Sequence, residues 1–227
     1  YFFIKRDTAN EEVYNRGFSV NDMFPVSTVG VVTAKDAVLI DTSKSLLLDK
    51  VADHYQIQPD KMLIANIDYR PFDKRYVYYD VSKIERPREK VMRHFTIGDN
   101  VGLMTCRQTV IDWSHIGVSK YIVDDSRVSN KTKERGYVFP LYLYDTQDGK
   151  TRHPNLDMEI VGHIADRIGL QFEEEKSGNI EAFCPMDLLD YIYGILHSPS
   201  YREQFKEFLK VDFPRIPYPT DANEFYR

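Results

Sequence analysis

Residues 185–219 constrain the fold of this chain more than any other stretch. Apolar residues recur at helical spacing on both sides of Pro199, which can open a helix but cannot continue one. This pattern predicts a helical hairpin over residues 187–210. Residues 213–219 include three prolines and are expected to be extended, because proline excludes helix and weakens a central strand. The C-terminal end therefore predicts two packed helices with an ordered exit.

The chain as a whole predicts an α+β fold, mixed and mainly antiparallel, with a β-rich body and a helical C-terminal part. The body is placed at residues 1–145, where short apolar runs alternate with turn signals. The helical part is placed at residues 146–227. It begins with a helix over residues 155–168, whose apolar residues recur every four positions, and continues through an acidic connection over residues 173–181. Together the two parts are expected to form one module.

Within the body, the first 45 residues are expected to be β-rich. We expect a helix over residues 44–55, a short helix opened by Pro87, and strands over residues 75–81, 101–110, 115–123 and 137–144. The polar segments 124–136 and 146–154 are expected to be loops.

The net charge of −5 argues at first sight against a nucleic-acid partner. However, residues 70–135 hold 14 Lys and Arg against 9 Asp and Glu, whereas residues 1–69 hold 7 against 10 and residues 136–227 hold 9 against 16. Duplex DNA responds to the local potential within about 8 Å at physiological salt, so a basic middle third suits DNA binding. An ordinary solvated face would give the same charge pattern.

The sequence lacks the motifs that catalytic centres require. It contains no Gly-rich phosphate loop, no nucleophile elbow and no methyltransferase motif for a flipped adenine. Its six histidines show no metal-ligand spacing. Residues 173–176 resemble a nuclease centre only in composition, and an exposed acidic connection is the better interpretation. We therefore expect no catalytic residue and no metal site.

Two further features limit the setting of the protein. Cys106 and Cys184 stand far apart without a CxxC partner, which indicates two reduced thiols in a cytoplasmic protein. No apolar run approaches the ~20 residues that a membrane span needs. The chain starts at Tyr1 in an aromatic run without a methionine, so we expect it to be a module cut from a longer polypeptide.

Seven pieces of the chain, in this order, resemble a known family. They are FPV (24–26) with GVVTAKD (30–36), YRPFD (69–73) with Arg75, RPR (86–88) with Met92, TCRQ (105–108), FPLY (139–142), PNL (154–156) and the helical hairpin. This series resembles the C-terminal target recognition domain of type ISP restriction-modification enzymes. These single-chain proteins join a nuclease, a helicase-like translocase, an adenine-N6 methyltransferase and a specificity domain. Lys35 is a departure, since we expect arginine there in many relatives; the charge is kept but a bidentate contact is not.

The resemblance implies a domain that binds double-stranded DNA, recognises a short asymmetric target, positions the methyltransferase and gates restriction. It implies a second partner, the upstream methyltransferase domain of the same polypeptide. S-adenosylmethionine, ATP and Mg²⁺ would be bound only by upstream domains, and this chain itself would need no cofactor and would not be an enzyme.

The basic residues within the resemblance suit a role that does not depend on the target sequence, either as phosphate contacts or as structural clamps. They are Arg70, Lys74, Arg75, Arg86, Arg88, Arg93 and Arg107. For Arg70 and Asp73, the alternative is an internal salt bridge that fixes a turn.

Base contacts are expected mainly from the polar loop at residues 124–135, which offers both donors and acceptors between two strands. The candidates are Lys35, Gln108, Ser126, Arg127, Ser129, Asn130, Lys131 and Lys133. The alternative is a plain surface loop. A second hypothesis for the whole chain is a docking domain that joins the methyltransferase and translocase without reading DNA. Salt-dependent duplex binding would distinguish the two hypotheses.

Overall fold

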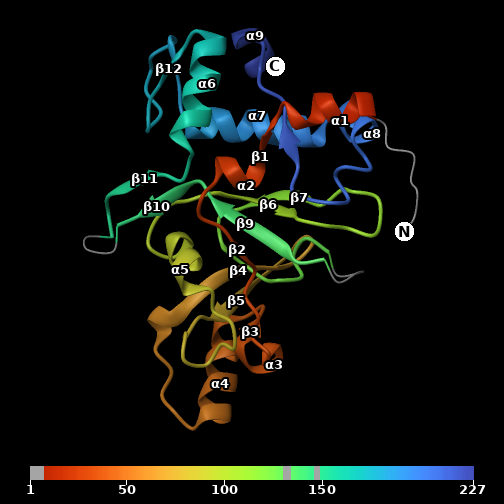
Figure 1. Ribbon diagram of the computed structural model, residues 1–227. Coiled ribbons are helices and arrows are strands. Elements are labelled where there is room, and N and C mark those ends of the chain that lie inside the picture. Colours follow the sequence, from red (N-terminus) through yellow and green to blue (C-terminus); the bar gives the residue numbers. More distant parts are fainter. Residues whose placement is uncertain (1–7, 130–133, 146–148) are drawn as a thin grey trace.

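A computed structural model describes residues 8–129, 134–145 and 149–227 (Figure 1). Most helices gather at one end of the molecule, above a four-stranded sheet. A second four-stranded sheet lies below, together with α4 (Lys44–Tyr55). The predicted α+β fold with mainly antiparallel strands is confirmed.

The upper sheet has the strand order β2-β9-β6-β7, and all its pairs are antiparallel. Its strands are β2 (Thr28–Val29), β6 (Gly102–Cys106), β7 (Ile116–Ser119) and β9 (Gly136–Pro140). Every residue of β6 is buried, which places this strand at the centre of the molecule. The strand predicted over residues 101–110 therefore ends early, at Cys106, and Arg107 and Gln108 follow in an exposed loop.

The lower sheet has the order β3-β5-β4-β8. Its strands are β3 (Ile40–Asp41), β4 (Ile64–Arg70), β5 (Asp73–Tyr78) and β8 (Ile122–Val123). β4 and β5 form a hairpin whose turn is Pro71–Phe72, and β8 lies parallel to β4. α4, which the sequence predicts over the same residues, packs against β5.

Two segments predicted as single strands are each divided between sheets. The strand expected over residues 115–123 splits into β7 in the upper sheet and β8 in the lower sheet. The strand expected over residues 137–144 splits at Leu141 into β9 and β10 (Tyr142–Tyr144), and β10 pairs with β11 (Arg152–Pro154). Both apolar runs pass from one sheet to another, which the alternation of residues alone does not reveal.

The C-terminal helices agree closely with the periodicity of the sequence. α6 (Met158–Ile168) ends at Gly169, whose φ of 69° is the left-handed conformation that glycine favours. The helix starts three residues later than predicted, at the Asp157 cap, because the Asn155 side chain instead holds the backbone of Val26 and Pro140.

The predicted hairpin consists of α7 (Pro185–His197) and α8 (Pro199–Gln204), with Ser198 capping the second helix. α8 ends at Gln204 rather than at residue 210, and turns follow. The extended exit is present as β14 (Arg215–Ile216), which pairs with β1 (Phe18–Ser19). The short parallel strands β12 (Gln171–Phe172) and β13 (Ala182–Phe183) flank the acidic connection.

The expected β-rich character of the first 45 residues is wrong for the part that the structure describes. α1 (Thr8–Asn15), α2 (Val20–Met23) and α3 (Asp36–Leu39) contain more residues than the three two-residue strands of this segment. The apolar residues between positions 14 and 24 pack with the C-terminal helices, whereas Val31, Leu39 and Ile40 pack with α4 and the lower sheet.

Two hydrophobic clusters make up the interior. We call the first the aromatic cluster. It joins residues 14–24 and the C-terminal helices to one face of the upper sheet, and it includes Phe24, Phe139, Phe183, Ile192 and Phe205. We call the second the sheet cluster; it joins α4 to the lower sheet and includes Leu47, Ile67, Val77, Met104 and Ile122. The predicted division at residue 145 stays a prediction, and the segment at residues 14–24 packs with the far end of the chain.

Short helices complete the fold: η1 (Lys61–Leu63), α5 (Glu89–Met92), η2 (Arg93–Phe95) and α9 (Ala222–Phe225). Within residues 8–129, 134–145 and 149–227, no helix has the length and apolar character needed to cross a membrane.

Candidate nucleic-acid interface

Three segments far apart in sequence meet beside Val31. The Val31 N–H donates to the Val123 carbonyl at 2.8 Å, and the Asp125 N–H donates to the Val31 carbonyl at 3.0 Å. Val32 exchanges backbone hydrogen bonds with Arg86 at 3.2 and 2.9 Å. The backbone thus brings residues 31–36, Arg86 and the loop after β8 to one edge of the molecule.

Glycine at position 30 permits this close approach. A Cβ there would lie 2.3 Å from the backbone carbon of Asp124, closer than any side chain allows. The Gly30 N–H also donates to the Gly136 carbonyl at 3.0 Å, which fixes the far end of the polar loop. Both ends of the segment 124–136 are therefore held by backbone contacts to residues 30 and 31.

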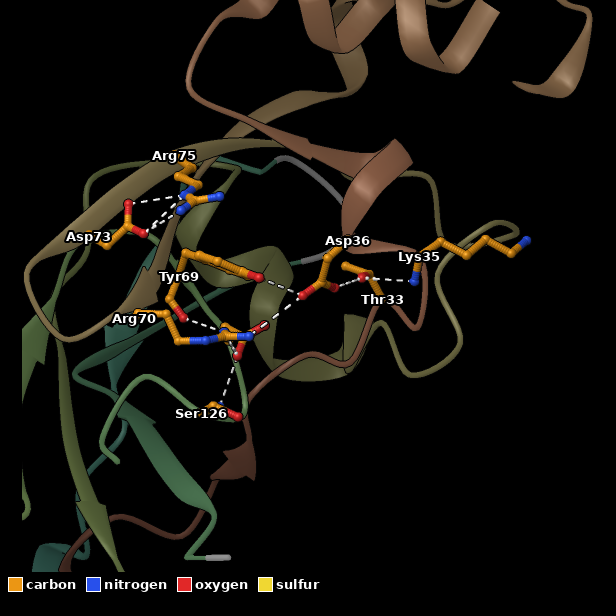
Figure 2. Close-up of polar contacts among 9 residues, drawn as sticks. Thr33, Lys35, Asp36, Tyr69, Arg70, Asp73, Arg75 and Ser126 are labelled. Atoms are coloured by element: carbon orange, nitrogen blue, oxygen red, sulfur yellow. Dashed lines mark hydrogen bonds and ion pairs between the residues drawn. The ribbon is translucent and has the colours of Figure 1, made fainter. Parts of the chain in front are cut away.

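Arg70, at the end of β4, is the centre of a polar network that we call the arginine cluster (Figure 2). Its members are Thr33, Asp36, Tyr69, Arg70, Asp124 and Ser126. The Arg70 guanidinium lies 2.5 Å from Asp124 and 3.5 Å from Asp36. Because both carboxylates come from other segments, Arg70 ties three parts of the chain together.

The remaining contacts orient the two carboxylates. The Tyr69 hydroxyl donates to Asp36 at 2.7 Å, and the Thr33 hydroxyl donates to the same carboxylate. The Ser126 N–H donates to Asp124 at 2.9 Å. Residues 31–34, Arg70 and residues 124–126 line an open cleft of about 430 Å³ beside this network.

Burial changes the proton affinity of the cluster. Asp124 is only 5% exposed, and this burial raises its pKa to about 6, although the Ser126 N–H and the Arg70 guanidinium lower it. Burial, together with the Asp36 carboxylate, also raises the pKa of the Tyr69 hydroxyl. The Asp124 carboxyl therefore takes up a proton under milder acidity than an exposed aspartate does.

The turn after β4 is fixed by a second arginine. The Arg75 guanidinium pairs with both oxygens of Asp73 at 2.7 to 3.0 Å, and this hydrogen bonding lowers the pKa of the Asp73 carboxyl. Arg70 and Arg75 both lie over the Tyr69 ring, at 3.8 and 4.4 Å from its centroid. Arg70 and Asp73 thus do form internal salt bridges, but with different partners.

Other predicted cations surround the cluster. Arg86 is exposed, and Arg88 is the N-cap of α5, with a φ of 55°. Burial raises the pKa of the Asp125 carboxyl. The guanidinium groups of Arg135, which lies 3.9 Å away, and of Arg88 and Arg86 lower it. Arg127 lies 3.9 Å from the buried Asp68.

Lys35 and Lys74 are exposed, and within the described part of the chain neither makes an ion pair. Their ammonium groups instead lie over the rings of Tyr55 and Tyr121, at 5.1 and 5.2 Å from the centroids. Lys35 also donates to the Tyr55 hydroxyl at 3.1 Å. Such cations can transfer to a phosphate without breaking a salt bridge.

Arg93, Arg107 and Gln108 do not join the arginine cluster. Arg107 pairs with Asp212 at 2.9 Å, and Gln108 donates to the Val211 carbonyl at 3.1 Å. Both contacts attach the loop after β6 to the C-terminal part. Arg93 begins η2, before His94, whose pKa burial lowers to about 4.

The last candidates lie in the polar loop. Ser129 is buried, whereas Asn130, Lys131 and Lys133 lie outside the described residues. Sequence reasoning missed the carboxylates of the cluster because its candidate contacts were cations, hydroxyls and amides. An aspartate directly after the apolar strand β8 was the available signal for Asp124.

The part of the chain that the structure describes contains no cluster of metal ligands. There, no group of three or more His, Cys, Asp and Glu side chains is arranged to hold a metal ion. Cys106 and Cys184 are free and buried, and burial raises the pKa of both thiols.

Comparison with known proteins gives one family. Residues 47–227 match the model of the family described as "Type ISP C-terminal specificity domain". A comparison with curated protein sequences gives no match.

Solved structures with a similar fold include three DNA complexes. The cryo-EM structure of a DrdV–DNA complex has a TM-score of 0.69 and 19% identity, covering 86% of this chain and 21% of that one. A nuclease-deletion mutant of the Type ISP restriction-modification enzyme LlaGI, with a DNA substrate mimic, has a TM-score of 0.66 and 18% identity, covering 95% and 22%. The ATP-dependent Type ISP enzyme LlaBIII bound to DNA has a TM-score of 0.69 and 18% identity, covering 94% and 16%. The present chain thus has the same fold as about a fifth of each of these longer chains.

Proposed function

The chain belongs to the family of Type ISP C-terminal specificity domains, and we propose that it binds double-stranded DNA and recognises a short asymmetric target sequence. The three similar structures are described as DNA complexes, which supports this proposal. The chain itself is non-catalytic and needs no cofactor.

The observation that carries the proposal is the convergence of cations at one edge of the molecule. Residues 31–36, the Arg86–Arg88 segment and the loop after β8 are joined there by backbone hydrogen bonds. Phosphate binding needs cations, and base reading needs donors and acceptors held on a fixed frame. This edge offers both, beside an open cleft.

The contacts suggest different roles for the predicted residues. Lys35, Lys74 and Arg86 are exposed, which suits phosphate binding, with Arg88 beside them. Arg70 and Arg75 are held by carboxylates and act mainly as the frame of this edge. The loop with Ser126, Arg127 and residues 129–133 supplies base contacts. Arg93, Arg107 and Gln108 play a smaller part, since they lie outside the cluster.

In the longer protein, this domain would position an adenine-N6 methyltransferase and gate restriction. The upstream methyltransferase domain would be its second partner, with the helical C-terminal part as the docking surface. S-adenosylmethionine, ATP and Mg²⁺ would be bound by those upstream domains. A DNA partner of this kind would place the protein in the cytoplasm.

The proposal is tested by retention of a randomised duplex pool on the purified chain at two salt concentrations. We expect retention that falls as salt rises, because each neutralised phosphate releases counterions, and an enriched short motif in the retained DNA. Retention without any enriched motif would contradict sequence recognition.

The alternative is a docking domain that joins the methyltransferase and translocase. The observation in its favour is that Arg70, Arg75 and Arg107 already pair with carboxylates of the chain. A docking domain would retain no duplex even at low salt, so the same experiment separates the two functions.

A further inference from the structure

Phe72 at the tip of the β4–β5 hairpin combines two unfavourable properties. Its side chain is 100% exposed to solvent. Its φ is 63°, in the left-handed region that bulky side chains rarely adopt. Pro71 before it and the positive φ follow the pattern of a type II turn, where glycine or asparagine is usual at the position of Phe72. A smaller residue at this position would therefore favour the stability of the fold more than phenylalanine does.

Strand pairing and side-chain contacts hold both ends of the turn that carries Phe72. β4 and β5 pair as far as Arg70 and Asp73, so only Pro71 and Phe72 lie between the strands. Asp73 is clamped by both oxygens to Arg75, and Arg70 donates to the Tyr69 carbonyl at 2.7 Å. A turn held in this way loses little conformational entropy when the exposed ring is inserted into a partner.

Among the described residues of this hairpin, Phe72 is the only exposed apolar side chain at the tip. The other exposed apolar residues beside this hairpin, Met62 and Val81, precede β4 and follow β5, at the opposite end. A protein interface is built around a contiguous apolar patch. In contrast, a DNA-bending wedge is a single apolar side chain between polar and cationic neighbours. Of the three cations that flank Phe72 in sequence, Arg70 and Arg75 pair with carboxylates, whereas Lys74 is exposed and makes no ion pair within the described part of the chain. The polar and cationic neighbours of the tip therefore suit duplex DNA better than an apolar protein surface.

We propose that Phe72 is a wedge that enters the stacked bases of the bound duplex and unstacks one base step. This inference rests on the proposed function and deepens it, because it assigns to the hairpin tip a role in deforming the target. Pyrimidine–purine steps unstack most easily. The recognised sequence should therefore contain a TA, CA or TG step at the position that meets the hairpin.

The test is permanganate footprinting of a randomised duplex pool retained by the full 227-residue chain. Permanganate oxidises unstacked thymines much faster than stacked ones. The wild-type chain should give hyperreactive thymines at one fixed position relative to the enriched motif. The variant Phe72→Asn should still retain duplex DNA but lose that hyperreactivity and the preference for the flexible step, whereas Phe72→Leu should keep both, because leucine still provides an apolar wedge.

Met62→Asn is the matched control, since Met62 is 88% exposed and lies at the other end of the same hairpin. It should leave the permanganate pattern unchanged. Thymines that stay unreactive with the wild type, or equally reactive with Phe72→Asn, would overturn the wedge while leaving the proposed function intact. Absence of any retained duplex would overturn the proposed function and the wedge together.

Discussion

The aromatic cluster and the arginine cluster are held together by different forces. In the aromatic cluster, rings such as Phe24 and Phe139 pack with centroids 5.8 Å apart, and the helices α6 and α7 bury their apolar faces. In the arginine cluster, the partly exposed Arg70 guanidinium is held by carboxylates from distant segments. The difference suggests that the aromatic cluster is a scaffold, whereas the arginine cluster can exchange contacts within the chain for contacts with a bound partner.

The two regions should also respond differently to solution conditions. Apolar burial is insensitive to pH and gains slightly from salt, whereas ion pairs near the surface weaken with salt and with protonation. Substitutions in each cluster can therefore test this contrast.

The largest effect is expected in the scaffold. Ile192 on α7 is fully buried in the aromatic cluster. Its replacement, Ile192→Ala, should lower the free energy of unfolding by about 2–5 kcal/mol, because it leaves a cavity. Urea denaturation measures this loss, which should be the same at pH 5 and pH 7.5. The variant Glu203→Ala is the control, since its side chain is 77% exposed. A loss of unfolding free energy that depends on pH would contradict the proposed difference between the two clusters.

The second prediction concerns the buried carboxylate. The folded-state pKa of Asp124 is raised to about 6 from 3.8, so between these values the folded chain binds a proton more tightly than the unfolded chain. The contribution of this group to stability is therefore lost as pH rises from about 4 to 6, at up to roughly 1.4 kcal/mol per pH unit. Asp124→Asn should remove that slope.

Denaturation of the wild type and Asp124→Asn at several pH values measures the difference between their slopes. Asp49→Asn is the control, because Asp49 is exposed on α4 and its side chain lies outside the cluster. Parallel pH profiles for wild type and Asp124→Asn would contradict the assignment.

The third prediction removes the cation from the same pair. Arg70→Ala should destabilise the fold by about 1–3 kcal/mol at pH 7.5, because it leaves the Asp124 carboxylate buried without its partner. The loss should be smaller at pH 5, where Asp124 is protonated in the folded chain. Arg16→Ala provides the control, since Arg16 forms an exposed pair with Glu12. An equal loss at both pH values would show that Arg70 acts through packing alone.

The fourth prediction tests the cations of the interface through DNA binding. The double variant Arg86→Glu and Arg88→Glu should weaken retention of all duplexes alike. The slope of log affinity against log salt should become shallower by about 2, one for each lost phosphate contact. Binding titrations at several salt concentrations measure the slope, and circular dichroism checks the fold. A variant that weakens some sequences and not others would instead assign these arginines to base reading.

The sequence predicted the scaffold better than the interface, for a physical reason. The helices α4, α6 and α7 show their apolar faces in local periodicity, and Pro199 marks the break between α7 and α8. The run at residues 115–123 looked like one strand because local alternation cannot show that β7 and β8 pair in different sheets.

The interface depends on contacts that local patterns do not encode. Arg70 and Asp124 are separated by 54 positions, and only the parallel pairing of β4 with β8 brings them together. The resemblance to a family identified Arg70, Arg86 and Arg88 as important positions but did not assign their partners. The exposure of Phe72 likewise depends on the hairpin register, which places it at the turn.

If the polar loop reads the target sequence, changing its side chains should change the sequence that is selected. The wild type and the triple variant Asn130→Ala, Lys131→Ala and Lys133→Ala would each select from the same randomised duplex pool, and the retained DNA would be sequenced. We expect the wild type to enrich one short motif and the triple variant to enrich an altered or shorter motif while still retaining DNA. An identical motif from both chains would show that the target is read elsewhere on the molecule.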